Sequence, residues 1–300
     1  MYKLSKCALC GKNGDIRLSH IVPHLVGRNL KKTSIGAIRN MENPNKPVQD
    51  IEKHYLLCGD CEKLFSSSET WFANHIFYPY LRDKKDSFDY DEHLHFFLTS
   101  LSWRSLFLDI MDFVEHGGVG IEALQCLIDS EAIMKSYLLN KRCDIGKIEN
   151  HILFFDRIEQ NSSELSEEFK HLQPHMTIHR GISSYTRCCE DVGTYFTITN
   201  MMGVIAVTLY RKGKEEKWIN TKVEIGNGNI KAKNQGMESV VPNEFEYMMK
   251  KSEKQKENLS EKEREKIEKK ISSIGEDIKN FDIYKDIIDD KNIDDNSDDK

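Results

Sequence analysis

The sequence predicts an α+β protein: a cysteine-bearing N-terminal unit, a helical middle region, and a β-rich C-terminal part that ends in a charged helix. Three observations predict this class. Four of the eight cysteines form two C-x-x-C pairs within residues 1–85. Apolar residues recur at helical spacing through residues 91–142, whereas β-branched and aromatic residues gather in short runs through residues 147–235. We therefore divide the chain into residues 1–85, 86–145, 146–245, 246–279 and 280–300.

The N-terminal unit is expected to contain a strand, a long loop and a helix. The segment "DIRLSHIVP" at residues 15–23 predicts a short strand that ends near Pro23, because the residue before a proline avoids the helical region. Residues 34–50 carry glycine, asparagine and two prolines without periodicity, which predicts a loop. Residues 58–77 show apolar side chains near a period of 3.6 and predict a helix that Pro79 ends.

The remaining regions follow the same logic. Residues 91–142 predict two helices separated by Gly117 and Gly118. The β-rich region predicts strands that include residues 150–158, 175–183, 194–201 and 203–213, and the sequence Gly-Asn-Gly at 226–228 predicts a hairpin. Residues 243–279 predict one charged helix, and the acidic, low-complexity residues 280–300 predict a disordered tail.

Composition and charge exclude some classes and favour others. The apolar runs are shorter than the roughly 20 residues of a membrane-spanning helix, and no apolar stretch follows the basic N-terminus. We therefore expect a cytoplasmic protein without membrane contact. The net charge is −6, but residues 1–85 hold 14 Lys and Arg against 8 Asp and Glu. A basic unit on an acidic chain fits a phosphate-binding module, with chance clustering as the alternative.

The cysteine spacing predicts a zinc site. Cys7, Cys10, Cys58 and Cys61 supply four thiolates from two C-x-x-C turns, which suits the tetrahedral sulfur shell of zinc. Disulfides are not expected in an unsecreted chain, and a redox motif would need only one pair. Because four protein ligands close the zinc shell, this zinc is expected to be structural. Any catalysis must then use other residues nearby.

These motifs together resemble a known family. A C-x-x-C knuckle, a strand that ends in "SHIVP", and "LLCGDCE" at a helix start look like the HNH endonucleases, the ββα-metal nucleases with a treble-clef zinc finger. The resemblance covers about residues 5–80. It implies a zinc-braced strand hairpin with a helix, and hydrolysis of phosphodiester bonds in nucleic acid, with DNA as the expected substrate. It also implies a catalytic Mg²⁺ or Mn²⁺ and a role in defence against foreign DNA.

The resemblance assigns roles to individual residues. His20 matches the general base, while Ser19 stands where a metal ligand is usual. Lys53 falls at the position of the asparagine that orients the base, and Glu62 occupies the place of the final histidine. A carboxylate suits Mg²⁺ or Mn²⁺, so Glu62 remains a candidate ligand. As alternatives, the carboxylate of Glu62 stabilises the positive N-terminal end of the helix, and His20 forms only structural hydrogen bonds near the zinc site.

Further candidates surround these positions. Glu69 lies two helical turns after Glu62 on the same face and could border one cleft with Glu62 and His20. His24, four residues after His20, is a further candidate metal ligand. Both could instead be ordinary surface residues. Four basic side chains are expected to bind backbone phosphates: Lys53, Arg28, Lys31 and Lys32. The alternative is that Arg28, Lys31 and Lys32 form an ordinary solvent-exposed face.

Two functions stay open. The first is a metal-dependent endonuclease, favoured by the intact His-Ile-Val-Pro segment and by Glu62. The second is a non-catalytic zinc finger that binds nucleic acid or a protein partner, favoured by the changes at Ser19, Lys53 and Glu62. One cleft shared by His20 and Glu62 would support the first, and side chains that point apart would support the second. Residues 86–245 carry no readable motif and could sense, form a homo-oligomer or bind a partner.

Overall fold

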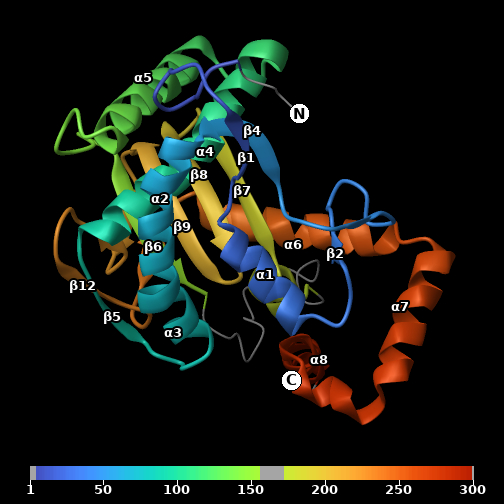
Figure 1. Ribbon diagram of the computed structural model, residues 1–300. Helices are drawn as coiled ribbons and strands as arrows, with labels where there is room; N and C mark the ends of the chain where they lie inside the picture. Colours follow the sequence, from blue (N-terminus) through green and yellow to red (C-terminus); the bar gives the residue numbers. More distant parts are fainter. Residues whose placement is uncertain (1–4, 156–171, 299–300) are drawn as a thin grey trace.

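The computed structural model describes residues 5–155 and 172–298 (Figure 1). Its N-terminal unit contains, in order, β1 (Ile16–His20), α1 (His24–Thr33), β2 (Ile38–Arg39), β3 (Pro47–Val48), β4 (Lys53–Cys58), α2 (Gly59–Phe72), the π-helix η1 (Ala73–Phe77) and α3 (Tyr78–Leu81). A mixed α+β chain with cysteine-bearing turns at its N-terminal end is confirmed.

Strands β1 and β4 form an antiparallel hairpin that brings two distant segments together. Ile16 pairs with Cys58 at one end of the ladder, and His20 pairs with Lys53 at the other. A bulge between Arg17 and Leu18 shifts the register. The cysteine end and the His20 end of the hairpin are therefore separated by the length of one short strand.

Three local expectations for this unit need correction. Residues 24–33 form α1, which was not predicted, and its apolar residues Val26 and Leu30 are buried. The predicted loop of residues 34–50 contains the small β2–β3 ladder. Pro79 does not end the helix, because α2, η1 and α3 follow one another without a break and Pro79 lies within α3, directly after the π-helical turn.

The middle of the molecule is an antiparallel five-stranded sheet covered by helices. Its strand order is β11 (Lys222–Val223), β6 (Glu149–Phe154), β9 (Val204–Arg211), β8 (Thr194–Met201) and β7 (Ile182–Cys189). The predicted helices are confirmed as α4 (Glu92–His116) and α5 (Ile121–Leu138), and α4 packs on the sheet. Figure 1 shows α2 and α4 in front of the sheet, with α6 (Pro242–Glu257) crossing behind it.

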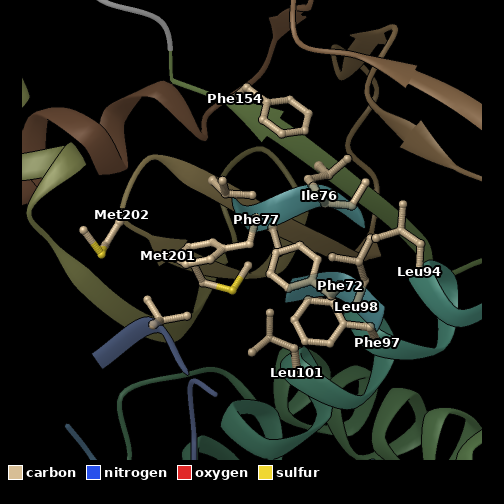
Figure 2. Packing of buried hydrophobic residues seen from close by; sticks show 14 of the residues in the cluster. Phe72, Ile76, Phe77, Leu94, Phe97, Leu98, Leu101, Phe154, Met201 and Met202 are labelled. Carbon is tan, nitrogen blue, oxygen red and sulfur yellow. The ribbon is translucent and has the colours of Figure 1, made fainter. Parts of the chain in front are cut away.

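The N-terminal unit and the sheet share one hydrophobic core. Phe72 stacks on Phe97 with ring centroids 4.1 Å apart, and Phe154 and Met201 of the sheet belong to the same cluster (Figure 2). All four side chains are buried. The β1–β4 hairpin is thus packed onto the rest of the chain through α2 and η1, rather than joined to it by a linker.

Two predictions in the β-rich region are wrong. The Gly226–Gly228 segment does not form a hairpin, because β11 pairs with β6 and β12 (Gly228–Lys231) pairs with β5 (Ser87–Tyr90). Residues 175–179 form the π-helix η3 (His175–His179) instead of a strand. The carboxylate of Asp290 accepts hydrogen bonds from the N–H groups of His175 and Met176, which satisfies donors at the start of this turn.

The remaining small sheet pairs β10 (Lys217–Ile219) with β13 (Gly236–Glu238).

The C-terminal part is helical and more ordered than expected. The single charged helix predicted for residues 243–279 is wrong, because the chain breaks after α6 and continues as α7 (Glu261–Ile274) and the 3₁₀ helix η4 (Gly275–Asn280). The helix α8 (Asp282–Asp298) follows. The predicted disorder of residues 280–300 is wrong for α8, in which Asp286 and Asp290 are each only 2% exposed. Residues 156–158 of one predicted strand lie outside the described residues. Within the described part of the chain, a membrane-spanning helix is absent.

Candidate functional site

The four predicted zinc ligands converge at one end of the β1–β4 hairpin. The sulfur atoms of Cys7, Cys10, Cys58 and Cys61 all lie within 4.8 Å of one another. Cys58 ends β4 and Cys61 lies in the first turn of α2, so the strand-to-helix turn presents both thiols to the same point. The structure therefore brings together four cysteines that could bind a metal ion such as zinc, and the donor set fits that ion.

The N-terminal cysteine turn is held against β4 by main-chain bonds. The N–H of Gly11 donates to the carbonyl of Cys7 at 2.8 Å, and Gly11 adopts a φ of +71°, which a glycine tolerates without strain. The N–H of Ala8 donates to the carbonyl of Leu56 at 3.0 Å. Although burial opposes ionisation of Cys58, hydrogen bonds from Cys61 and the neighbouring thiols lower the pKa of Cys58 to about 7. Burial raises the pKa of Cys7 and of Cys61, so among these three thiols it is Cys58 whose surroundings favour the thiolate that metals bind.

A second group of polar side chains gathers at the opposite end of the hairpin. His20 Nε2 and Lys53 Nζ each lie 3.0 Å from Oδ2 of Asp50. The exposed fractions are 23% for His20, 34% for Lys53 and 24% for Asp50, so water and a ligand can reach all three. Burial acts to raise the pKa of Asp50, but the bonds from His20 and Lys53 outweigh it and hold that pKa well below its ordinary value.

His24 completes this group from the first position of α1. Its ring stacks on His20 with centroids 4.8 Å apart, and its Nε2 lies 4.0 Å from Oδ1 of Asp50. Pro23 directly precedes α1 and fixes the turn that carries the chain from His20 into the helix. Partial burial, together with the nearby His20, lowers the pKa of His24 and so favours its neutral form. The ligand atoms of His20, His24 and Asp50 lie within 4.8 Å of one another.

Glu62 lies away from this group. It accepts a hydrogen bond from the hydroxyl of Ser19, which in turn accepts the N–H of Leu57 at 3.3 Å. Ser19 is 2% exposed, and consecutive strand residues point to opposite faces. Glu62 and His20 therefore lie on opposite sides of β1, and the structure does not bring them into one cleft.

Glu69 also has a different partner. Its Oε1 accepts from the guanidinium of Arg104 at 2.5 Å, and Arg104 is 2% exposed. The same guanidinium lies 4.9 Å from the ring centroid of Phe65. This carboxylate therefore compensates the buried charge of Arg104 in a contact between α2 and α4.

Helix α1 carries basic residues on the side that begins at His24, next to His20 and Asp50. Arg28, Lys31 and Lys32 are exposed and follow His24 by four, seven and eight residues, which places them on one side of the helix. The ammonium group of Lys31 donates to the carbonyl of Gln49, next to Asp50. The basic residues that the sequence singled out thus lie beside the polar group.

Comparison of the chain with protein-family models, with curated proteins and with solved structures gives no significant match. The site must therefore be interpreted from its own residues.

Asp50 is the site residue that sequence reasoning missed. It ends a segment interpreted as a loop, and a single aspartate in a loop carries no periodic signal. One indirect signal existed: Asp50 is three residues before Lys53, and antiparallel pairing of β1 with β4 places that stretch opposite His20. A carboxylate beside a histidine is the common arrangement for holding an imidazole in one orientation.

Proposed function

We propose that this chain is an endonuclease that uses a divalent metal ion to hydrolyse phosphodiester bonds in nucleic acid, with DNA as the expected substrate. The observation that carries the proposal is the contact between His20 and Asp50 at the accessible end of a zinc-type hairpin. Asp50 supplies the carboxylate that the sequence had placed at Glu62. The basic face of α1 supports the proposal, because cationic side chains bind backbone phosphates without regard to sequence.

In this mechanism His20 accepts a proton from the attacking water. With a hydrogen on Nε2, the ring donates to Oδ2 of Asp50, and Nδ1 is left as the proton acceptor. Asp50 also stabilises the cationic ring after the transfer. Lys53 balances the charge of Asp50, and its partly exposed ammonium group is a candidate to bind the phosphate. A histidine base of this kind typically contributes about 10²–10⁴-fold to the rate.

The divalent ion implied by the resemblance fits this end of the hairpin. His24 and Asp50 offer an imidazole and a carboxylate beside the base, whereas Glu62 and Glu69 are engaged elsewhere. When bound, the ion would neutralise the scissile phosphate and stabilise the leaving oxygen. The zinc predicted at the four cysteines would maintain the fold and take no part in the chemistry.

The test is cleavage of plasmid and single-stranded DNA and of RNA by the zinc-loaded chain, with Mg²⁺, Mn²⁺ or EDTA. We expect metal-dependent cutting that falls by about 10²-fold or more in His20→Ala. The matched control is His116→Ala, because His116 contacts Asp112 at the same 3.0 Å on an exposed helix end. Cutting by His20→Ala at the wild-type rate would overturn the role of His20.

A specific observation favours a second function, a zinc finger that binds nucleic acid or a protein partner without cutting. The Ser19–Glu62 hydrogen bond occupies two positions where the HNH resemblance expects ligands, and it lies on the side of β1 away from His20. Tight, salt-sensitive DNA binding without cleavage under any metal would select this alternative. Variants of Arg28 and Lys32 would then weaken binding, while His20→Ala would not.

A further inference from the structure

We infer that His24 and Asp50 form a divalent-cation site that is distinct from the four-cysteine cluster and leaves His20 free as a base. Its catalytic role rests on the proposed function, but its existence does not. The inference places a ligand at Asp50, where the sequence pattern gave none. It also separates two tasks, metal binding and proton transfer, between neighbouring histidines.

The two oxygens of Asp50 face different partners. Oδ2 accepts from His20 and from Lys53, each at 3.0 Å. Oδ1 accepts the N–H of Ile51 at 2.9 Å and faces His24 Nε2 at 4.0 Å. A carboxylate oxygen accepts more than one interaction, so the N–H bond leaves Oδ1 able to bind a cation.

The 4.0 Å gap between His24 and Asp50 fits a shared cation better than a direct bond. It exceeds the 2.7–3.2 Å range of an N–H···O hydrogen bond. Two ligands that each lie about 2.1 Å from one ion can be separated by at most about 4.2 Å, so the observed gap is compatible. The ring of His20 stacks on that of His24 in this arrangement without contributing a ligand atom to the proposed site.

The donor set predicts which cations bind. One imidazole and one carboxylate suit Mn²⁺ and similar transition ions better than Mg²⁺, which prefers oxygen ligands throughout. Only two protein ligands leave positions for water and for a phosphate oxygen. His24 is 52% exposed, so the site is open to both.

Lys53 opposes the cation from the other side of the carboxylate. Its ammonium group sits on Oδ2 and carries a positive charge close to any ion at Oδ1. A divalent cation and a unit positive charge about 5 Å apart repel each other, and in water at physiological salt this repulsion corresponds to roughly fivefold in the cation dissociation constant. Removal of this charge should therefore tighten cation binding about fivefold, an effect in the opposite direction to the loss of a ligand.

The experiment is Mn²⁺ titration of the zinc-loaded full chain without substrate, followed by the electron paramagnetic resonance signal of free Mn²⁺ and by calorimetry. We expect one site per chain. Binding should weaken at least tenfold in His24→Ala and Asp50→Asn, change less than threefold in His20→Ala, and tighten about fivefold in Lys53→Met. His116→Ala and Asp112→Asn remove the comparable exposed pair and serve as controls.

Each result decides the inference. It is overturned if the wild type holds no Mn²⁺, if His24→Ala binds like the wild type, or if His20→Ala loses binding as fully as Asp50→Asn. Circular dichroism and zinc content verify folding, and His24→Gln replaces His24→Ala if the latter misfolds. Since no nucleic acid is present, intact Mn²⁺ binding in a chain that never cuts would refute the nuclease and leave the metal site standing.

Discussion

The imidazole of His20 and the carboxylate of Asp50 meet at 3.0 Å across the open end of the hairpin, although thirty residues separate them in the chain. His20 is the last residue of β1, and Asp50 lies three residues before β4 begins. The pairing of β1 with β4 is therefore what creates the contact. The same pairing brings Cys58 to the knuckle at the other end, so the zinc-type cluster and the His–Asp contact depend on one ladder.

Asp50→Asn should reduce cleavage much more than it reduces stability. The amide cannot hold the positive ring of His20 after proton transfer, and we expect the rate to fall by about 10²–10⁴-fold. Asp50 is 24% exposed, so solvent screening limits its contribution to folding to about 1 kcal/mol. Single-turnover cleavage and urea unfolding measure the two effects. Asp112→Asn is the control, and an unaltered cleavage rate would refute the role of Asp50.

Cys58→Ser should unfold the N-terminal unit. Loss of one sulfur ligand weakens structural zinc, whose apparent binding free energy in small domains is about 10–16 kcal/mol and contributes directly to folding. We expect loss of zinc, measured by atomic absorption, together with a lower melting temperature. Cys143→Ser is the matched control, because Cys143 is exposed and lies outside the cluster. Equal zinc content in both variants would argue against a four-cysteine zinc site.

Asp290→Ala should destabilise the fold by about 3–5 kcal/mol, because it leaves buried donors without their acceptor. Asp290 Oδ1 lies 2.6 Å from the buried ring of His175, and its carboxylate also accepts two main-chain N–H groups of η3. Guanidinium unfolding measures the loss. Asp277→Ala, an exposed acidic residue in η4, provides the control. Similar midpoints for the two variants would show that α8 does not support η3.

Acid should destabilise the protein through two buried histidines. Burial lowers the pKa of His95 to about 4 and that of His151 to about 4, against an ordinary value of 6.5. As pH falls from 7 to 5, the unfolded chain takes up protons that the folded chain does not. The free energy of unfolding should therefore fall by about 2 kcal/mol for each histidine.

The measurement for this prediction is urea unfolding at pH 7 and pH 5. His151→Gln should remove its own share of the pH dependence, while the exposed control His116→Gln should keep the full dependence. A pH dependence that is identical in the wild type and in His151→Gln would contradict the assignment to His151.

Sequence reasoning succeeded where a structural feature depends on local spacing. Each C-x-x-C pair is a local turn, and the helical periods of α4 and α5 repeat within one segment. It failed where a partner comes from far along the chain. Asp50 reaches His20 only because β4 pairs with β1. Residues 175–179 form η3 instead of a strand because the carboxylate of Asp290 accepts hydrogen bonds from its first N–H groups.

The composition of residues 280–300 did not indicate that most of them form the helix α8. The acidic, low-complexity sequence predicted disorder, but Asp286, Asp290 and Ile293 recur at intervals of four and three and are all buried. Such spacing is that of one helix face. An acidic stripe becomes a packed face here because histidine and arginine side chains of another segment, His175, His179 and Arg180, lie against it.

The dependence of η3 on Asp290 sets an order of events during synthesis. After His175, another 115 residues, up to and including Asp290, must be translated before the N–H groups of η3 meet their acceptor. At the usual rate of about 5–20 residues per second, that interval lasts roughly 6–23 s. The β1–β4 hairpin can close and bring its four cysteines together long before then. Arg180 donates to Ser34 just after α1 and lies 3.9 Å from Asp286, so it gains that acidic neighbour only after α8 has been synthesised. A nascent chain should therefore hold its cysteine cluster first, and acquire the final packing around α1 only when α8 leaves the ribosome.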